Sequence, residues 1–125
     1  MRILLAEDDH HISVILKIAL EKVGGHQVHV VSDGVEALQL VQQQKFDLLI
    51  LDGMMPKKSG LQVAQDLKAS GQTEIPIIFL SAKSEKKDLQ AFAQFGNGYI
   101  AKPFDPMTIS QEIDRILFNK KEMAP

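Results

Sequence analysis

The feature that most constrains the fold of this chain is a fivefold alternation of short apolar runs with longer segments of helical period. Glycine, proline, serine or aspartate separates each run from the next segment, as at turns between strands and helices. The runs predict five strands, at residues 2–6, 27–31, 47–51, 76–80 and 98–101. Most of these strands are too apolar for a half-solvated sheet, so we expect helices to cover both of its faces.

The intervening segments predict five helices. The first should cover residues 11–23 and bury six apolar side chains along one stripe: Ile12, Ile15, Leu16, Ala19, Leu20 and Val23. The second and third should begin at Asp33 and Ser59, because Glu or Gln follows each of these capping residues three places on. The fourth is expected at about 84–95, and the fifth should open at Asp105, which Pro106 follows.

Strands and helices that alternate with such short connections predict an α/β fold, in which a doubly wound parallel sheet lies between two helical layers. The carboxyl ends of parallel strands share one edge of the sheet, and ligands of open α/β sheets bind there. Polar residues follow four of the five predicted strands: Glu7, Asp8 and Asp9, then Asp52, Ser81 and Lys102. We therefore expect these side chains to gather at that edge.

Composition excludes several classes of function. The 125 residues suit one compact domain, and a formal net charge of −2 gives no overall attraction to nucleic acid, so direct DNA binding is not expected. No apolar run has membrane-spanning length, and the first run meets acidic residues too soon for a signal peptide. We therefore expect a cytoplasmic protein without membrane insertion. Because the chain has no cysteine, only histidine, aspartate and glutamate side chains can bind a metal.

The acidic residues at the predicted edge set its chemistry. Asp52 ends an apolar run, where a buried carboxylate is costly, and Glu7 and Asp8 should lie beside it. Carboxylates crowded together repel one another until a proton binds or a cation lies between them. Oxygen ligands without cysteine favour Mg²⁺ as that cation.

Four motifs connect the chain to a known family. They are LLAEDD, LLILDGMMP, FLSAK and YIAKPF, at the ends of the first, third, fourth and fifth predicted strands. In these motifs, their order and their spacing, the chain resembles the receiver domain of two-component response regulators over essentially its whole length, as a stand-alone receiver of the chemotaxis-regulator kind. The resemblance implies a flavodoxin-like (βα)5 sheet with strand order 2-1-3-4-5, a receiver domain at residues 1–121 and a short tail at 122–125.

By this resemblance, Asp52 is the phosphoacceptor of a phosphorylation-activated switch. The donor would be a phosphohistidine on a histidine kinase or a phosphotransfer protein. Glu7, Asp8 and Asp52 would bind Mg²⁺, with the backbone carbonyl of Met54 completing the protein ligands. The protein would then not be an enzyme, although it would assist its own phosphorylation and slow dephosphorylation.

The resemblance also names residues that act on the phosphoryl group. Lys102, the Ser81 hydroxyl and nearby backbone N–H groups would stabilise its oxygens, and the small Ala82 would keep the approach open. Ser81 and Tyr99 would switch together and alter the face of the fourth helix, fifth strand and fifth helix, where an effector protein would bind. A cis peptide bond before Pro103 would aim the Lys102 amine into the site.

Two further expectations concern the lifetime of the signal and its output. Met54 would shield the phosphoryl group from water, and Lys83 cannot accept a proton from water, so dephosphorylation should be slow. Only a short tail follows the last predicted helix, so the output should be the binding of a partner protein. Phosphorylation could also drive dimerisation.

Other functions would make different demands on the same residues. Seen singly, an acid before a helix is usually a cap and a lone lysine is a solvated surface residue. A haloacid-dehalogenase phosphatase would need its nucleophilic aspartate after the first strand and a second aspartate two residues later, whereas Met54 stands two residues after Asp52. A flavodoxin would need a phosphate-binding loop in place of the acids after the first strand. A degenerate receiver that binds partners without phosphorylation stays open as an alternative.

The chain departs from the family pattern in two places. Ser81 stands where threonine is more frequent, which keeps the hydroxyl group but loses a methyl group. The turn at residues 95–98, which leads into the fifth predicted strand, is one residue shorter than is common in the family, and the sequence does not settle its conformation.

Overall fold

The computed structural model describes residues 1–72 and 74–122, apart from the side chains of residues 83–85 and 119–122. Five parallel strands form one sheet in the order β2-β1-β3-β4-β5, which confirms the predicted order. They are β1 (Arg2–Ala6), β2 (Gln27–Val31), β3 (Leu48–Asp52), β4 (Ile77–Ser81) and β5 (Gly98–Ala101). Because β3 and β4 lie one residue later than predicted, Asp52 and Ser81 are the last residues of their strands.

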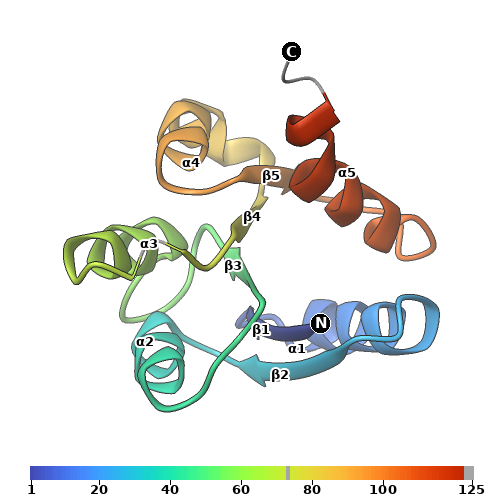
Figure 1. Ribbon diagram of the computed structural model, residues 1–125, viewed down its shortest axis with the longest axis horizontal. Coiled ribbons are helices and arrows are strands. Elements are labelled where there is room, and N and C mark those ends of the chain that lie inside the picture. Colours follow the sequence, from blue (N-terminus) through green and yellow to red (C-terminus); the bar gives the residue numbers. More distant parts are fainter. Residues whose placement is uncertain (73, 123–125) are drawn as a thin grey trace.

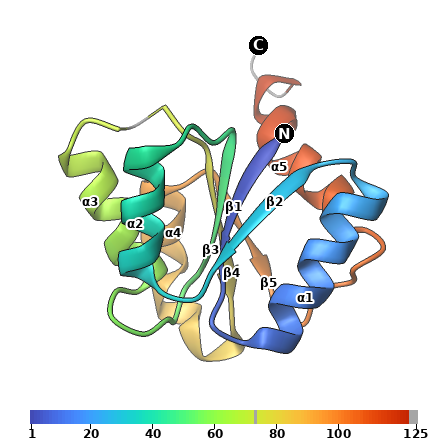
Figure 2. The ribbon, with the colours of Figure 1, turned by 90° about the horizontal axis from the view of Figure 1, so that it is seen from below.

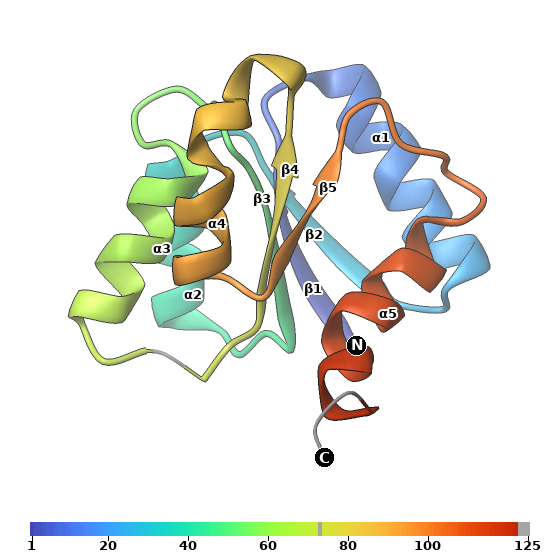
Figure 3. The same cartoon turned by 90° about the horizontal axis from the view of Figure 1, so that it is seen from above.

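Helices cover both faces of the sheet, as predicted. One face carries α1 (His10–Ile18), the π-helical turn η1 (Ala19–Val23) and α5 (Ile109–Glu122) (Figure 1). The other face carries α2 (Gly34–Gln43), α3 (Gly60–Ala69) and α4 (Leu89–Phe95), which the 3₁₀ helix η2 (Lys83–Asp88) precedes. Figure 3 shows the three layers, with the sheet between the two groups of helices. Among the described helices, none combines the length and the apolar character that a membrane span requires.

Each strand divides its side chains between two cores, because successive residues of a strand point to opposite faces. Ile3 and Leu5 of β1 lie in the core beneath α1 and α5, whereas Leu4 and Ala6 lie in the core beneath α2, α3 and α4. All residues of β3 and β4 are buried. The carboxyl ends of these two central strands are therefore rigid supports for whatever chemistry is placed on them.

Side-chain caps start three of the helices. Ser59 forms a reciprocal capping box at α3, and the Asp33 carboxylate accepts a hydrogen bond from the first turn of α2, which confirms both predicted starts. The Asp9 carboxylate accepts hydrogen bonds from the N–H groups of His11 and Ile12 and caps α1.

The last helix begins later than predicted. Residues 106–108 form a separate turn, which Asp105 closes by accepting hydrogen bonds with both its carboxylate and its carbonyl oxygen. The capping signal at Asp105 therefore belongs to this turn, and α5 starts at Ile109. The helix continues to Glu122, and residues 123–125 of the predicted tail lie outside the described part of the chain.

The outer side of α1 and η1 departs from the predicted burial pattern. Ile15 and Val23, which were predicted to face the core, are 46% and 54% exposed, so this prediction is wrong. Of the six residues of the predicted stripe, Leu16, Ala19 and Leu20 are buried in the core and Ile12 is partly buried. The apolar stripe on α1 and η1 is wider than the surface that the sheet and α5 cover. The π-helical turn also changes the angular spacing of the last residues of the stripe. The helix consequently presents apolar side chains to solvent.

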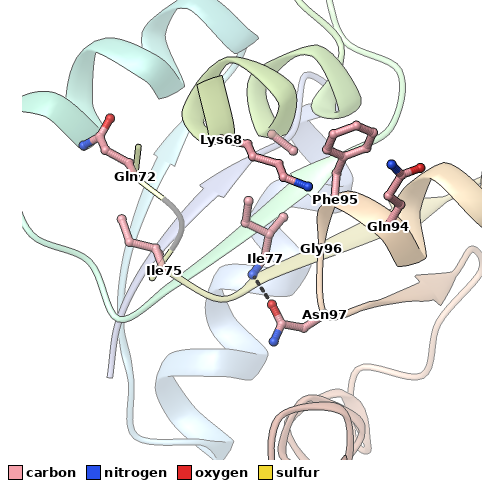
Figure 4. Close-up of a pocket in the computed structure, with 9 residues that line it drawn as sticks. Lys68, Gln72, Ile75, Ile77, Gln94, Phe95, Gly96 and Asn97 are labelled. Carbon is pink, nitrogen blue, oxygen red and sulfur yellow. Dashed lines mark hydrogen bonds between the residues drawn. The ribbon is translucent and has the colours of Figure 1, made fainter. Parts of the chain in front are cut away.

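Asn97 closes the short turn before β5. Its side-chain Oδ1 accepts a hydrogen bond from the Ile77 N–H (3.0 Å), and its own N–H donates to the Ile77 carbonyl (2.7 Å; Figure 4). A Cβ on Gly96 would lie 2.6 Å from a ring carbon of Phe79, so this close approach to β4 requires glycine. The turn thereby extends the pairing of β4 with β5 by one position. The pocket of about 240 Å³ between the turn and Lys68 lies at the amino end of β4, opposite the predicted site.

Candidate functional site

Three acidic side chains meet at the carboxyl edge of the sheet, which is the lower edge in Figure 2, where β1 leads into α1. The register of β1 and β3 pairs Ala6 with Leu51, so the residues that follow, Glu7 and Asp52, come side by side. Carboxylate oxygens of Glu7, Asp8 and Asp52 all lie within 4.8 Å of one another. The structure therefore brings together three of the acids that the sequence placed at this edge.

Lys102 follows β5 and places its amine between two of these acids. Its Nζ lies 2.8 Å from Glu7 Oε1 and 3.2 Å from Asp52 Oδ1. The Lys102–Pro103 peptide bond is cis, as the resemblance implies, and the Lys102 N–H donates to the Ser81 carbonyl. Burial acts to lower the pKa of Lys102, but the hydrogen bond to Glu7 and the two carboxylate charges outweigh it and raise the pKa. The amine is therefore a cation held inside the pocket.

The cluster of Glu7, Asp8, Asp52 and Lys102, here called the acid pocket, carries more negative than positive charge. Asp52 and Glu7 are only 4% and 2% exposed. Burial in the first place, and then the hydrogen bond and charge of Glu7, raise the pKa of Asp52 to about 8, although Lys102 acts in the opposite direction. At neutral pH the acid pocket therefore favours binding of a proton or of a further cation.

The side chains present fit Mg²⁺. They offer hard carboxylate oxygens, two of them on buried residues and one on the exposed Asp8, which leaves room for water ligands. Met54, predicted to add a backbone carbonyl, has its backbone beside the acids, because its N–H donates to Asp52 Oδ1 (3.4 Å). Within the described residues, no other group of three acidic or histidine side chains is close enough together to hold a metal.

The remaining predicted site residues lie around the acid pocket. Ser81 is buried at the end of β4, and its hydroxyl donates to the Ala82 carbonyl over a long 3.3 Å. Tyr99 is 42% exposed and Met54 is 62% exposed, so neither side chain is enclosed in this structure. The side chain of Lys83 lies outside the described residues, and its predicted role stays a prediction.

Two further contacts shape the site. Asp9, which was expected among the edge acids, caps α1 with its carboxylate, and its N–H donates to Glu7 Oε2 (3.1 Å). Gly60, at the start of α3, packs against the backbone of Asp52, because a Cβ there would lie 2.4 Å from the Asp52 carbonyl oxygen. The Ser59-Gly60 pair signals a helix start in the sequence, but it does not signal this tertiary contact.

Known proteins are similar to this chain over most of its length. Residues 3–114 match the sequence model of the family described as the response regulator receiver domain. The chain is 39% identical over 118 residues to the transcriptional regulatory protein RprY of Bacteroides fragilis, covering 94% of this chain and 49% of that protein. It is 34% identical over 125 residues to the alkaline phosphatase synthesis transcriptional regulatory protein PhoP of Bacillus subtilis, covering 99% of this chain and 51% of that protein. The chain thus spans about half the length of these curated relatives.

Solved structures share the fold. The receiver domain of the sensor histidine kinase PA1611 from Pseudomonas aeruginosa, described with a magnesium ion coordinated in the active site cleft, is 28% identical with a TM-score of 0.81. That match covers 93% of this chain and 96% of the other. The chemotaxis response regulator CheY4 of Vibrio cholerae is 26% identical with a TM-score of 0.83, over 92% of this chain and 97% of that one. Both matches extend over nearly the whole of each chain.

The raised pKa of Asp52 should make stability depend on pH when divalent cations are absent. Because the folded chain keeps a proton on Asp52 that the unfolded chain releases, stability falls as pH rises from 3.8 toward 8. Asp52→Asn removes this titration. In EDTA, we expect the stability advantage of Asp52→Asn over the wild type to grow by a few kcal/mol between about pH 5 and about pH 8, measured by urea unfolding. The same advantage at both pH values would contradict the raised pKa.

Proposed function

The chain belongs to the response regulator receiver domain family, and we propose that it is a phosphorylation-activated switch with Asp52 as its phosphoacceptor. Receiver domains of this family act as phosphorylation-dependent switches in two-component systems. The observation that carries the proposal is the acid pocket, in which the buried Asp52 lies beside acids that fit a divalent cation and 3.2 Å from the Lys102 amine.

The atoms around Asp52 suit phosphoryl transfer from phosphohistidine. A carboxylate oxygen of Asp52 bonds to phosphorus while the P–N bond breaks, and the imidazole keeps that electron pair and takes a proton from solvent. The transition state spreads negative charge over three equatorial oxygens, so catalysis is mostly positioning and charge stabilisation. The Lys102 amine can stabilise one oxygen, and the Ser81 hydroxyl, whose hydrogen bond to the Ala82 carbonyl is long, can donate to another.

Mg²⁺ is the proposed cofactor of the acid pocket. Glu7, Asp8 and Asp52 would hold it, with the Met54 carbonyl as a further ligand. When bound, the ion supplies positive charge to the phosphoryl oxygens and lowers the pKa of Asp52, so that the carboxyl group is ionised at neutral pH. The magnesium ion described in the PA1611 receiver domain supports the same ion here.

A degenerate receiver, which would bind partners without being phosphorylated, is the competing proposal. A receiver that is never phosphorylated would not need a buried aspartate beside a compensating amine. In this chain the three acids, Lys102 and Ser81 lie together at the carboxyl edge of the sheet. We therefore favour the phosphoacceptor. Because the phosphoryl group ends on the protein itself and not on a separate substrate, we class the protein as a signalling switch and not as an enzyme.

Proteins are the proposed partners at both steps. The donor would be a histidine kinase or a phosphotransfer protein, and the exposed Ile15, which shares a groove with Lys102 and Ala82, supports a protein donor beside the acid pocket. The receiver of the signal would be an effector protein on the face of α4, β5 and α5, and phosphorylation could also drive dimerisation through it. Direct DNA binding by these residues is not proposed, and the system would work in the cytoplasm.

Ser81 and Tyr99 form the proposed link between the acid pocket and that face. A phosphoryl oxygen is a stronger acceptor than the Ala82 carbonyl, so phosphorylation should draw the Ser81 hydroxyl toward Asp52. The movement would leave space for the exposed Tyr99 ring to turn inward, and the populations of the two positions would report the phosphorylation state.

Small phosphodonors such as acetyl phosphate should label this protein at Asp52 in the presence of Mg²⁺. Asp52→Asn should abolish the added phosphate, because it removes the attacking carboxylate. Asp9→Asn is the matched control, since asparagine also caps a helix and Asp9 stands outside the metal cluster. Intact mass spectrometry decides, and equal labelling of Asp52→Asn and the wild type would show that the acceptor is another residue.

Beryllofluoride, which mimics a bound phosphoryl group, should shift NMR signals on α4, β5 and α5 as well as those of the acid pocket. In Ser81→Ala, beryllofluoride should still bind, but the distant shifts should be largely lost, because no hydroxyl is drawn toward Asp52. Wild-type shifts confined to the acid pocket would contradict the proposed link through Ser81 and Tyr99.

The phosphorylated protein should lose its phosphoryl group slowly, with a half-life of minutes to hours. Met54 has no group that orients water by a strong hydrogen bond, so replacing it with asparagine should shorten the half-life several-fold. Met107→Asn is the control, because Met107 is also exposed but lies in the segment before α5. A half-life of seconds that is unchanged in Met54→Asn would contradict shielding by this residue.

A further inference from the structure

The connection between β3 and α3, residues 53–59, contains a disfavoured backbone conformation. Lys57 has a φ of 67°, in the left-handed region that residues with a side chain seldom adopt. The Lys58 N–H donates to the Pro56 carbonyl (2.7 Å) and closes a tight turn around Lys57. Such a conformation persists only where the surrounding structure holds it, and it lies five residues beyond Asp52.

The start of α2 is the structure that holds this turn. A Cβ on Gly34 would lie 2.2 Å from the Lys58 carbonyl oxygen and 2.6 Å from Lys58 Cβ, so only glycine allows the two segments to come this close. The neighbouring Asp33 is buried, and its Oδ2 pairs with Lys57 Nζ at 3.5 Å. In Figure 2 the connection after β3 lies beside the first turn of α2.

Both ends of this connection also contact Asp52. Its first residues include Met54, whose N–H donates to Asp52 Oδ1 (3.4 Å). Its far end leads into Gly60, which packs against the Asp52 carbonyl oxygen, so that a Cβ would lie 2.4 Å from it. A displacement of Lys58 would therefore shift backbone that contacts Asp52 at both ends of the connection.

We propose that Gly34 and Asp33 of α2 are positioning residues for the acid pocket. By holding the turn at Lys57, they fix the backbone of Met54 against Asp52, although neither residue touches the acid pocket. The proposal rests on the function proposed above, because it assigns these residues to the binding of Mg²⁺ and the phosphorylation of Asp52.

The test is Gly34→Ala, with Gly24→Ala as the matched control. Both substitutions add a methyl group where a Cβ would clash. Gly24, however, lies before the amino end of β2, and its contacts are the side chains of His26 and of Ser110 in α5. We expect Gly34→Ala to weaken Mg²⁺ binding by about 10- to 100-fold in isothermal titration calorimetry, as is typical when a residue that orients metal ligands is lost. Labelling by acetyl phosphate should slow in parallel, whereas Gly24→Ala should bind Mg²⁺ as the wild type does.

A second variant keeps the test decisive if Gly34→Ala does not fold. In Gly34→Ala/Lys57→Gly, residue 57 can turn in either sense, so the connection can move away from the added methyl group while the chain folds. Mg²⁺ binding that is much weaker in this double variant than in Lys57→Gly alone would support positioning by Gly34. Wild-type Mg²⁺ affinity in a folded Gly34→Ala variant would overturn it.

Wild-type behaviour separates the phosphoacceptor assignment of Asp52 from the role of α2. If the wild type binds no Mg²⁺ and is not labelled at Asp52, the phosphoacceptor assignment is wrong. If the wild type does both, and Gly34→Ala does both equally well, only the role of α2 is wrong.

Discussion

The electrostatic compensation of Asp52 is the interaction on which the rest of this structure depends. A carboxylate at the end of a fully buried strand is destabilising unless charges of opposite sign lie close to it. Lys102 supplies one such charge at 3.2 Å, but Glu7 and Asp8 add negative charge, so the acid pocket still favours a proton or a divalent cation. The same imbalance that lowers stability suits the proposed binding of Mg²⁺ and of a phosphoryl group.

The fold separates the parts that must be rigid from the parts that must move. β3 and β4 are buried along their whole length and end on Asp52 and Ser81, so the proposed acceptor is held firmly. Tyr99, in the edge strand β5, is 42% exposed and is not enclosed by the core. In the proposed switch, a local charge in the acid pocket biases the position of this side chain without disturbing the central strands.

The connection after β3 shows that a site can depend on residues outside it. Gly34 lies eighteen positions before Asp52 in the chain and makes no contact with the acids, yet it permits the close approach that shapes the connection carrying Met54. Nothing about Gly34 in the sequence suggests this, because an aspartate-glycine pair before an apolar helix is an ordinary helix start. Contacts of this kind depend on how α2 and α3 pack together.

The sequence by itself determined the three layers and brought Glu7, Asp8, Asp52 and Lys102 to one edge, because apolar periodicity identifies the elements and parallel strands share the edge at their carboxyl ends. The strand order followed from the resemblance of its motifs to receiver domains. It did not determine which apolar residues of α1 are covered, so Ile15 was wrongly predicted to be buried. It also left open that Asn97 would extend the pairing of β4 and β5 across a shortened turn. These features were decided by the tertiary structure, since the width of a helix contact and the close approach of two backbones depend on the neighbouring elements and not on local residue pattern.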